Sequence, residues 1–276
     1  MKTSLGVNIR YPVLIEAGDG SGSGFYVKNK KSIFLVTATH VLFDSNAKLL
    51  SKKIQLTSYG HDLEKDERIT IEVNLLEVEI RRSKDKDIVV VELGKTDDDK
   101  EEGSFSFHWG KGVIAGKKPT SGVVIVPAGG LSKFDEVGIS NDVFVLGYPN
   151  SVGLDGQIDK TMPLLRKGVV AGKNKDRGTI VLDCPVYFGN SGGIVIEVEV
   201  DDLGKRKFKV IGVVSQYVPF IEKLFSLQLK YINKNYENSG YAIAVPIDDI
   251  FELTEEKPIK PEVGSETTLK PESRQK

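Results

Sequence analysis

The amino-acid sequence predicts an all-β fold. Around a dozen short segments are rich in Val, Ile, Phe and Tyr, and each is bounded by Gly, Pro, Asn or Asp. The first group of residue types favours strands, and the bounding residues favour turns. Few segments carry the hydrophobic repeat of an amphipathic helix, so the pattern is typical of a barrel or a sandwich.

The predicted strands fall into two groups, separated by a highly charged segment at 95–103. The first group comprises residues 11–17, 24–28, 32–38, 53–59, 69–80 and 87–93. The second group comprises residues 122–128, 142–148, 178–184, 192–200, 208–216 and 241–247. Residues 248–253 have helical potential, and the Pro-, Glu- and Lys-rich residues 255–276 predict a disordered polar tail.

The composition narrows the class of protein. The chain has 276 residues, enough for one large domain or two packed half-domains, and its formal net charge is −1. A nearly neutral chain has no overall field that favours nucleic acid or a membrane surface, so we expect neither as a partner. A single cysteine excludes an intramolecular disulfide, and the first residues lack the apolar stretch of a signal peptide. We therefore expect a soluble, cytoplasmic protein.

Ser191, in the segment YFGNSGG, is the strongest candidate for a nucleophile. A serine hydroxyl needs a neighbouring base, usually a histidine held by a carboxylate, and donors for the oxyanion that forms. Gly-x-Ser-x-Gly also occurs in α/β-hydrolases, but that fold needs its histidine after the serine. All three histidines of this chain precede Ser191, which excludes the α/β-hydrolase arrangement.

His40 and Asp87 are the best candidates for the base and its carboxylate. His40 ends an apolar segment, and the alternative to a catalytic role for it is that of a partly buried structural histidine. His61 and His108 lie in polar or turn-like segments. Asp87 borders the apolar run IVVVEL, whereas Asp85 lies between two lysines and is expected to be solvated. No two histidines have the spacing of metal ligands, so we expect no metal site and no cofactor.

The segments TATH, DIVVVEL and GNSGG occur in this order, supported by GSGSGFYV, VFVLGYP and DCPVYFGNSGG. Together they resemble the trypsin/chymotrypsin-like serine peptidases, and most closely the bacterial intracellular, HtrA-like branch without a PDZ domain. The resemblance implies two packed six-stranded antiparallel β-barrels within a peptidase domain at 1–254. The first barrel would span about 8–115, the second about 118–246, and a short C-terminal helix about 247–254.

The same resemblance implies a role for each site residue. Ser191 would attack the substrate carbonyl, His40 would take its proton and return it to the leaving amine, and Asp87 would orient His40. The backbone of Gly189, Asn190 and Ser191 would form the oxyanion hole. The wall of the specificity pocket would be formed by Pro185, Val214, Ser215 and Gln216.

The resulting prediction is a serine endopeptidase whose partner is a protein or peptide substrate. The segment VVSQ would pair with the substrate as an added antiparallel strand, and a small or medium apolar side chain is expected before the cleaved bond. Asn190 stands where digestive enzymes carry an Asp that pairs with a new N-terminal ammonium. We therefore expect activity without N-terminal processing, from a site that is either preformed or switched by an activating protein partner. The alternative is a catalytically silent barrel that binds peptides or proteins.

Overall fold

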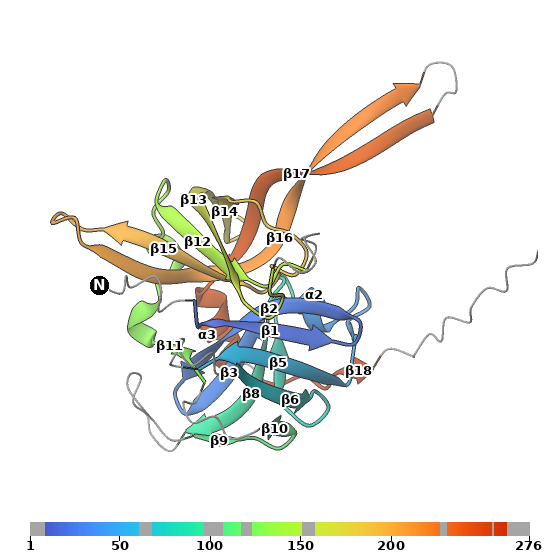
Figure 1. The fold of residues 1–276 in the computed structure, drawn as a ribbon, viewed down its shortest axis with the longest axis vertical. Coiled ribbons are helices and arrows are strands. Elements are labelled where there is room, and N and C mark those ends of the chain that lie inside the picture. The colour runs from blue at the N-terminus through green and yellow to red at the C-terminus, as the bar shows by residue number, and fades with distance from the viewer. Residues whose placement is uncertain are drawn as a thin grey trace, which may run out of the picture.

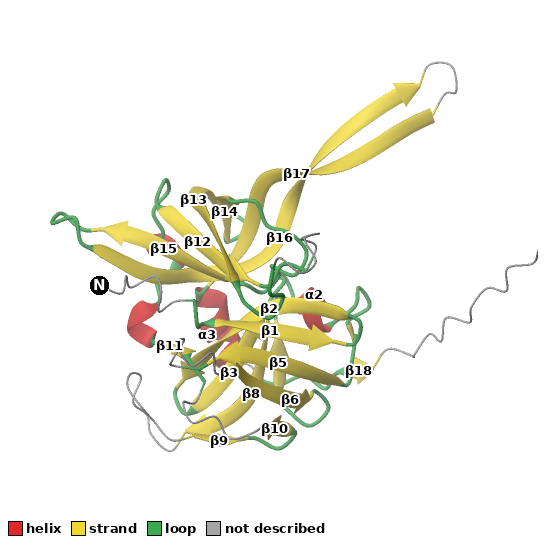
Figure 2. Ribbon diagram, in the orientation of Figure 1, coloured by secondary structure: helices red, strands yellow, loops and turns green. Residues whose placement is uncertain are grey.

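The computed structural model describes residues 9–60, 68–96, 107–116, 123–150, 158–226, 231–255 and 257–263. Strands dominate this part of the chain, and its helices are short (Figure 1, Figure 2). The predicted all-β class is confirmed. None of the helices in these ranges has the length and apolar character needed to cross a membrane.

The first half of the chain folds into one curved sheet. Its strands are β1 (Pro12–Ala17), β2 (Gly20–Asn29), β3 (Ser32–Thr37), β5 (Lys53–Tyr59), β6 (Arg68–Asn74), β7 (Ile80–Arg82), β8 (Val89–Thr96), β9 (Phe107–Trp109), β10 (Val113–Ala115) and β11 (Ile125–Val126). The order is β10-β6-β5-β1-β2-β3-β8-β7, with β9 beside β8 and β11 parallel to β2. The predicted six-stranded barrel is wrong for this half, because along the described residues the sheet has 10 strands and is not closed.

One predicted strand of this half is divided in two. The apolar run at 69–80 was expected to be continuous, but β6 ends at Asn74 and β7 begins at Ile80. A turn separates them, in which the Glu77 amide donates to the Asn74 carbonyl at 3.0 Å. Asn favours turns because its side chain bonds nearby backbone groups, and here the Asn74 side chain accepts from the Leu76 amide.

The second half forms a closed barrel. Its strands are β12 (Asp142–Gly147), β13 (Leu164–Asn174), β14 (Thr179–Asp183), β15 (Ile194–Val200), β16 (Arg206–Ser226) and β17 (Tyr231–Pro246). They close in the order β12-β13-β14-β17-β16-β15, which confirms the predicted six-stranded second barrel. Two short 3₁₀ turns, η2 (Ala128–Gly130) and η3 (Phe134–Glu136), precede it.

Three apolar clusters stabilise the two halves and their junction. One lies inside the first sheet, and another lies inside the second barrel. The third joins the halves: Phe25 and Val36 of the first sheet share it with Ile194 and Val213 of the second barrel. Burying this apolar surface is favourable in proportion to its area, so the halves are held face to face and their loops meet at one junction.

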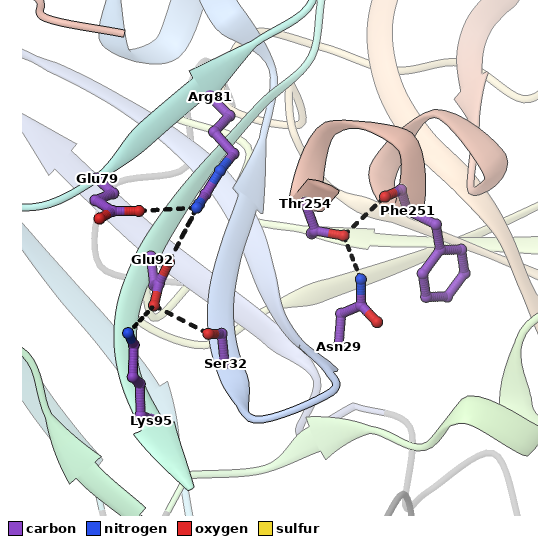
Figure 3. A network of polar contacts seen from close by, with 8 residues as sticks. All are labelled: Asn29, Ser32, Glu79, Arg81, Glu92, Lys95, Phe251 and Thr254. Atoms are coloured by element: carbon purple, nitrogen blue, oxygen red, sulfur yellow. Dashed lines mark hydrogen bonds and ion pairs between the residues drawn. The ribbon is translucent and has the colours of Figure 1, made fainter. Parts of the chain in front are cut away.

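The C-terminal helix α3 (Asp248–Glu255) returns from the second barrel to the first sheet. Ile250 and Leu253 are buried in the shared cluster. On the polar side of the helix, the Asn29 side-chain amide donates to the Thr254 hydroxyl oxygen, and the Thr254 O–H donates to the Phe251 carbonyl (Figure 3). The predicted helix at 247–254 is therefore present, displaced by one residue.

The segment after α3 corrects the prediction of a disordered tail at 255–276. The Ile259 amide donates to the Ile80 carbonyl at 2.7 Å, and its side chain packs on the core of the first sheet. β18 (Glu262–Val263) then pairs in parallel with β4 (Lys48–Leu49). Residues 257–263 are thus part of the fold, and residues 264–276 lie outside the described ranges.

A largely buried arginine links three strands near the sheet edge. The Arg81 guanidinium lies 2.8 Å from Glu79 and 3.2 Å from Glu92, and the Ser32 hydroxyl donates to Glu92 at 2.9 Å (Figure 3). A buried charge needs such partners because the interior solvates it poorly. The network fixes β7 and β8 beside β3.

Candidate active site

His40 lies in a single helical turn at the junction of the two halves. α2 (Thr39–Leu42) follows β3 directly, and the side chains of Val41 and Leu42 are buried. His40 is left half-exposed, with Nδ1 at 2.8 Å from Asp87 Oδ2. The His40 backbone amide also donates to Asp87 Oδ1, at 3.2 Å. Because Nδ1 is occupied, Nε2 is the ring nitrogen left to accept a proton.

Asp87 lies two residues before β8 and is held by two side chains. Besides His40, the hydroxyl of Ser215 donates to Asp87 Oδ2 at 2.8 Å. Burial alone would raise the pKa of Asp87, but the hydrogen bonds and charge of His40, together with the Ser215 hydroxyl, lower the pKa below its usual value. Asp87 is therefore an anion at neutral pH. Asp85, the alternative carboxylate, lies exposed in the preceding turn.

Ser215 has a contact that sequence analysis missed. It was expected only in the wall of the specificity pocket. In the structure its side chain is buried on β16 and reaches from the second barrel to a carboxylate carried by the first sheet. The carboxylate that pairs with His40 is therefore also held by a side chain of the second barrel.

The loop that carries Ser191 depends on two glycines in left-handed conformations. Gly189 has φ +92°, and a Cβ there would lie 2.2 Å from the Tyr148 carbonyl oxygen. Gly192 has φ +81°, and a Cβ there would lie 2.2 Å from Thr37 Oγ1. Only glycine satisfies both the conformation and the close approach. Gly192 thus packs on the end of β3. Ser191 is therefore brought to the side of the junction where β3 leads into α2, the helical turn that carries His40.

Ser23 of β2 anchors this loop, and sequence analysis did not single it out. Its amide donates to the Ser191 carbonyl at 2.8 Å. Its fully buried hydroxyl donates to the Gly189 carbonyl at 2.6 Å and accepts from the Tyr148 amide at 2.8 Å. The available signal was the segment GSGSGFYV, in which serines alternate with glycines before the apolar residues of the strand.

The backbone amides of Gly189 and Ser191 point away from the groups that bond the preceding carbonyls. The Phe188 carbonyl accepts from the Asn150 amide at 3.0 Å, and the Asn190 carbonyl accepts from the Gly193 amide at 2.8 Å. In a trans peptide the N–H points opposite to the carbonyl, so the amides of Gly189 and Ser191 point away from these partners. Neither amide has a hydrogen-bond acceptor within the described residues. Two such donors can stabilise an oxyanion.

Asn190 closes the loop from within. Its side chain is 1% exposed, and its Oδ1 accepts from the Tyr187 amide at 3.0 Å. Its own amide donates to the Tyr187 carbonyl at 2.9 Å, so of the three residues predicted to form the oxyanion hole, Asn190 has its amide bonded within the loop. An amide side chain in this place holds the turn without a charged partner.

The predicted pocket residues are distributed over different surroundings. Val214 is a core residue of the second barrel whose carbonyl accepts from the Gly192 amide at 2.7 Å. Pro185 is half-buried beside the loop. Ser215 and Gln216 line a cleft of about 740 Å³ that also contains Asp87 and, along β16, Val218.

The other histidines lie apart from this arrangement. His108 is on β9, paired with Lys95 at the edge of the first sheet, and His61 lies outside the described residues. Across the residues that the structure describes, no group of three or more His, Cys, Asp or Glu side chains could hold a metal ion.

Comparisons with known proteins bear on the family and the fold. A family model described as a trypsin-like peptidase domain matches residues 22–202. No curated protein matches the chain in sequence. Human heparin binding protein is similar in structure, with 14% identity and a TM-score of 0.52 over 91% of this chain and 94% of that chain. Deg5 has 20% identity and a TM-score of 0.49 over 89% and 88% of the two chains, respectively. These likenesses concern the fold.

Proposed function

Because the chain belongs to the trypsin-like peptidase family, we propose that it is an active serine endopeptidase. His40 Nε2 takes the Ser191 proton as the hydroxyl attacks the carbonyl of the cleaved bond, and the same nitrogen returns the proton to the leaving amine. Asp87 holds the other ring nitrogen and stabilises the imidazolium that forms. Water then hydrolyses the acyl-enzyme on Ser191 by the same proton route.

The single observation that carries the proposal is the hydrogen-bonded set of His40, Asp87 and Ser215, together with the two amides of the serine loop that have no acceptor in the described residues. Ser215 Oγ and His40 Nδ1 each lie 2.8 Å from the same carboxylate oxygen. The amides of Gly189 and Ser191 have no acceptor in the described part of the chain, and the carbonyls that precede them are both tied back. This supports an oxyanion hole that exists before substrate binds.

The proposed enzyme needs no cleavage near its N-terminus. In the digestive enzymes a new terminal ammonium holds the serine loop through a carboxylate. Here Asn190 bonds the Tyr187 amide, and Ser23 bonds the Gly189 carbonyl, so groups already present in the chain hold the loop. We also propose that no activating partner is required to form the hole.

A fluorophosphonate probe tests the proposal, because it labels only a serine that is activated as a nucleophile. Wild type should be labelled in the absence of any other protein. Labelling should disappear in Ser191→Ala and His40→Ala and persist in His108→Ala, which changes a histidine away from the site. Absence of labelling in folded wild type would support the silent, peptide-binding barrel, and labelling only after a partner is added would support a gated enzyme.

A further inference from the structure

β16 and β17 continue past the second barrel as a two-stranded hairpin. Figure 1 shows it rising away from both halves of the molecule. Its register runs from Pro219 opposite Asn238 to Ser226 opposite Tyr231. Six large apolar side chains of the hairpin are between 45% and 60% exposed: Phe220, Ile221, Leu224, Phe225, Ile232 and Tyr236. Apolar side chains gathered in this way on one exposed element are typical of a binding surface.

One edge of the hairpin is open from the catalytic residues outward. β15 pairs with β16 only as far as Val213, and the backbone of Val214 bonds Gly192 and Gly193. From Ser215 to Phe225, β16 has β17 on one side and no strand on the other within the described part of the chain. An open strand edge presents unpaired N–H and carbonyl groups, which can accept a further strand.

The same edge runs along the cleft beside the catalytic carboxylate. Asp87, Ser215 and Gln216 line this cleft, and Val218 extends it to the base of the hairpin. β16 runs from Ser215 toward the hairpin tip. A peptide paired antiparallel to it therefore runs from the tip toward Ser191, so its residues on the N-terminal side of the cleaved bond lie along the hairpin.

We propose that the hairpin is an extension of the substrate site, which binds an extended, mainly apolar segment of a protein substrate. The proposal rests on the proposed peptidase function and specifies its substrate class. Between Ser215 and Phe225 the edge has room for about ten substrate residues at about 3.3 Å each. The enzyme would then select unfolded or flexible polypeptides that reach from the hairpin into the cleft.

The charges on β16 define the segment further. On one face of the hairpin, Lys223 lies between Ile221 and Phe225; on the other face, Glu222 lies between Phe220 and Leu224. Because neighbouring strands pair side chains on the same face, a matching segment carries apolar residues around one acidic and one basic residue.

The cross-strand register supplies a matched pair of variants. Ile221 lies opposite Tyr236, and Phe225 lies opposite Ile232. Ile221→Ser/Phe225→Ser and Tyr236→Ser/Ile232→Ser therefore disrupt the same two cross-strand contacts, and both leave the hairpin equally weakened. Only the first removes the side chains of the strand whose open edge would hold the substrate.

Two readouts separate the hairpin from the catalytic site. Fluorophosphonate labelling reports the site, and we expect the same labelling rate in both variants. Binding of fluorescein-labelled casein, an unfolded protein with apolar segments, is measured by anisotropy on the Ser191→Ala protein carrying each pair of substitutions. We expect the casein Kd to rise about tenfold for the β16 pair and about twofold or less for the β17 pair.

Equal losses of casein affinity in the two variants, or none, would overturn the proposal. Two other results would also overturn the proposal, if casein affinity were unchanged in the β16 variant. One is that the β16 substitutions abolish a dimer seen in sedimentation. The other is that they abolish binding to phosphatidylglycerol vesicles. Those outcomes would assign the hairpin to a second copy of the chain or to a lipid surface. Failure of the peptidase function is seen separately, as absence of labelling in wild type, because casein binding is measured without catalysis.

Discussion

Replacing Ser23 by alanine should cost both stability and activity. The substitution removes a hydroxyl that is 0% exposed and leaves two buried backbone groups unpaired, the Gly189 carbonyl and the Tyr148 amide. An unsatisfied buried polar group costs about 1–3 kcal/mol, so the free energy of unfolding should fall by about 2–6 kcal/mol. For a chain of this size, 1 kcal/mol corresponds to about 2–4 °C in Tm.

The assay compares Ser23→Ala with Ser21→Ala by urea unfolding and by fluorophosphonate labelling. Ser21 lies two residues earlier on the same strand, is half-buried, and accepts a hydrogen bond from the Asn150 side chain at 3.0 Å. Its loss should change the free energy of unfolding by about 0.5 kcal/mol or less. Ser23→Ala should also label more slowly, because the Gly189 peptide is no longer fixed. If both variants are equally stable and label at the wild-type rate, Ser23 is not the anchor of the loop.

Three further predictions concern the surroundings of the site. Asp87→Asn should lower kcat by about 10⁴-fold with little loss of folded protein, because the neutral amide no longer fixes the His40 tautomer; a decrease below tenfold in casein hydrolysis would contradict this. Lys86→Met leaves the Asp249 carboxylate, 14% exposed and 2.7 Å from the ammonium, without its partner. Lys86→Met should lower the free energy of unfolding in urea by about 1–3 kcal/mol. Adding Asp249→Leu should recover most of that loss of stability. If the two substitutions have additive effects, the two side chains are not coupled. Burial raises the pKa of Glu197 above its unfolded value of 4.5. The stabilising contribution of protonated Glu197 is therefore fully present below pH 4.5 and is lost as the pH rises through the raised pKa. The Tm of Glu197→Gln should increase relative to that of wild type between about pH 4.5 and 7.5. A Tm difference that stays constant over this range would refute the prediction.

The residues proposed as catalytic could be singled out because their chemistry is marked locally in the sequence. His40, Asp87 and Ser191 each lie in a short segment whose residue types are unusual, and only their order had to be considered. The contacts that were missed join residues that lie far apart in the chain. Ser23 bonds a carbonyl 166 residues away, and Ser215 bonds a carboxylate 128 residues away. A serine in a strand carries no mark of such a partner.

The strands that were missed lack the pattern that predicts strands. β13 carries Arg166, Lys167 and Lys173 and alternates only weakly between buried and exposed positions. The outer part of the hairpin has exposed apolar and charged residues on both faces, so no period of two indicates a buried side. The segment at 257–263 is rich in proline and lysine, yet Ile259 packs on the first sheet and β18 pairs with β4. The HtrA-like branch and the cytoplasmic location stay predictions.

The docking of Ile259 on the first sheet has a consequence for synthesis of the chain. All ten strands of that sheet have been made by residue 126, but the side chain that covers part of its core is added more than a hundred residues later. During synthesis the first sheet leaves the ribosome while this part of its core is still exposed. The second barrel must be synthesised before Ile259 can cover that part of the core. A chain that stopped after α3 would keep His40, Asp87 and Ser191 and still leave uncovered the part of the first sheet on which Ile259 packs.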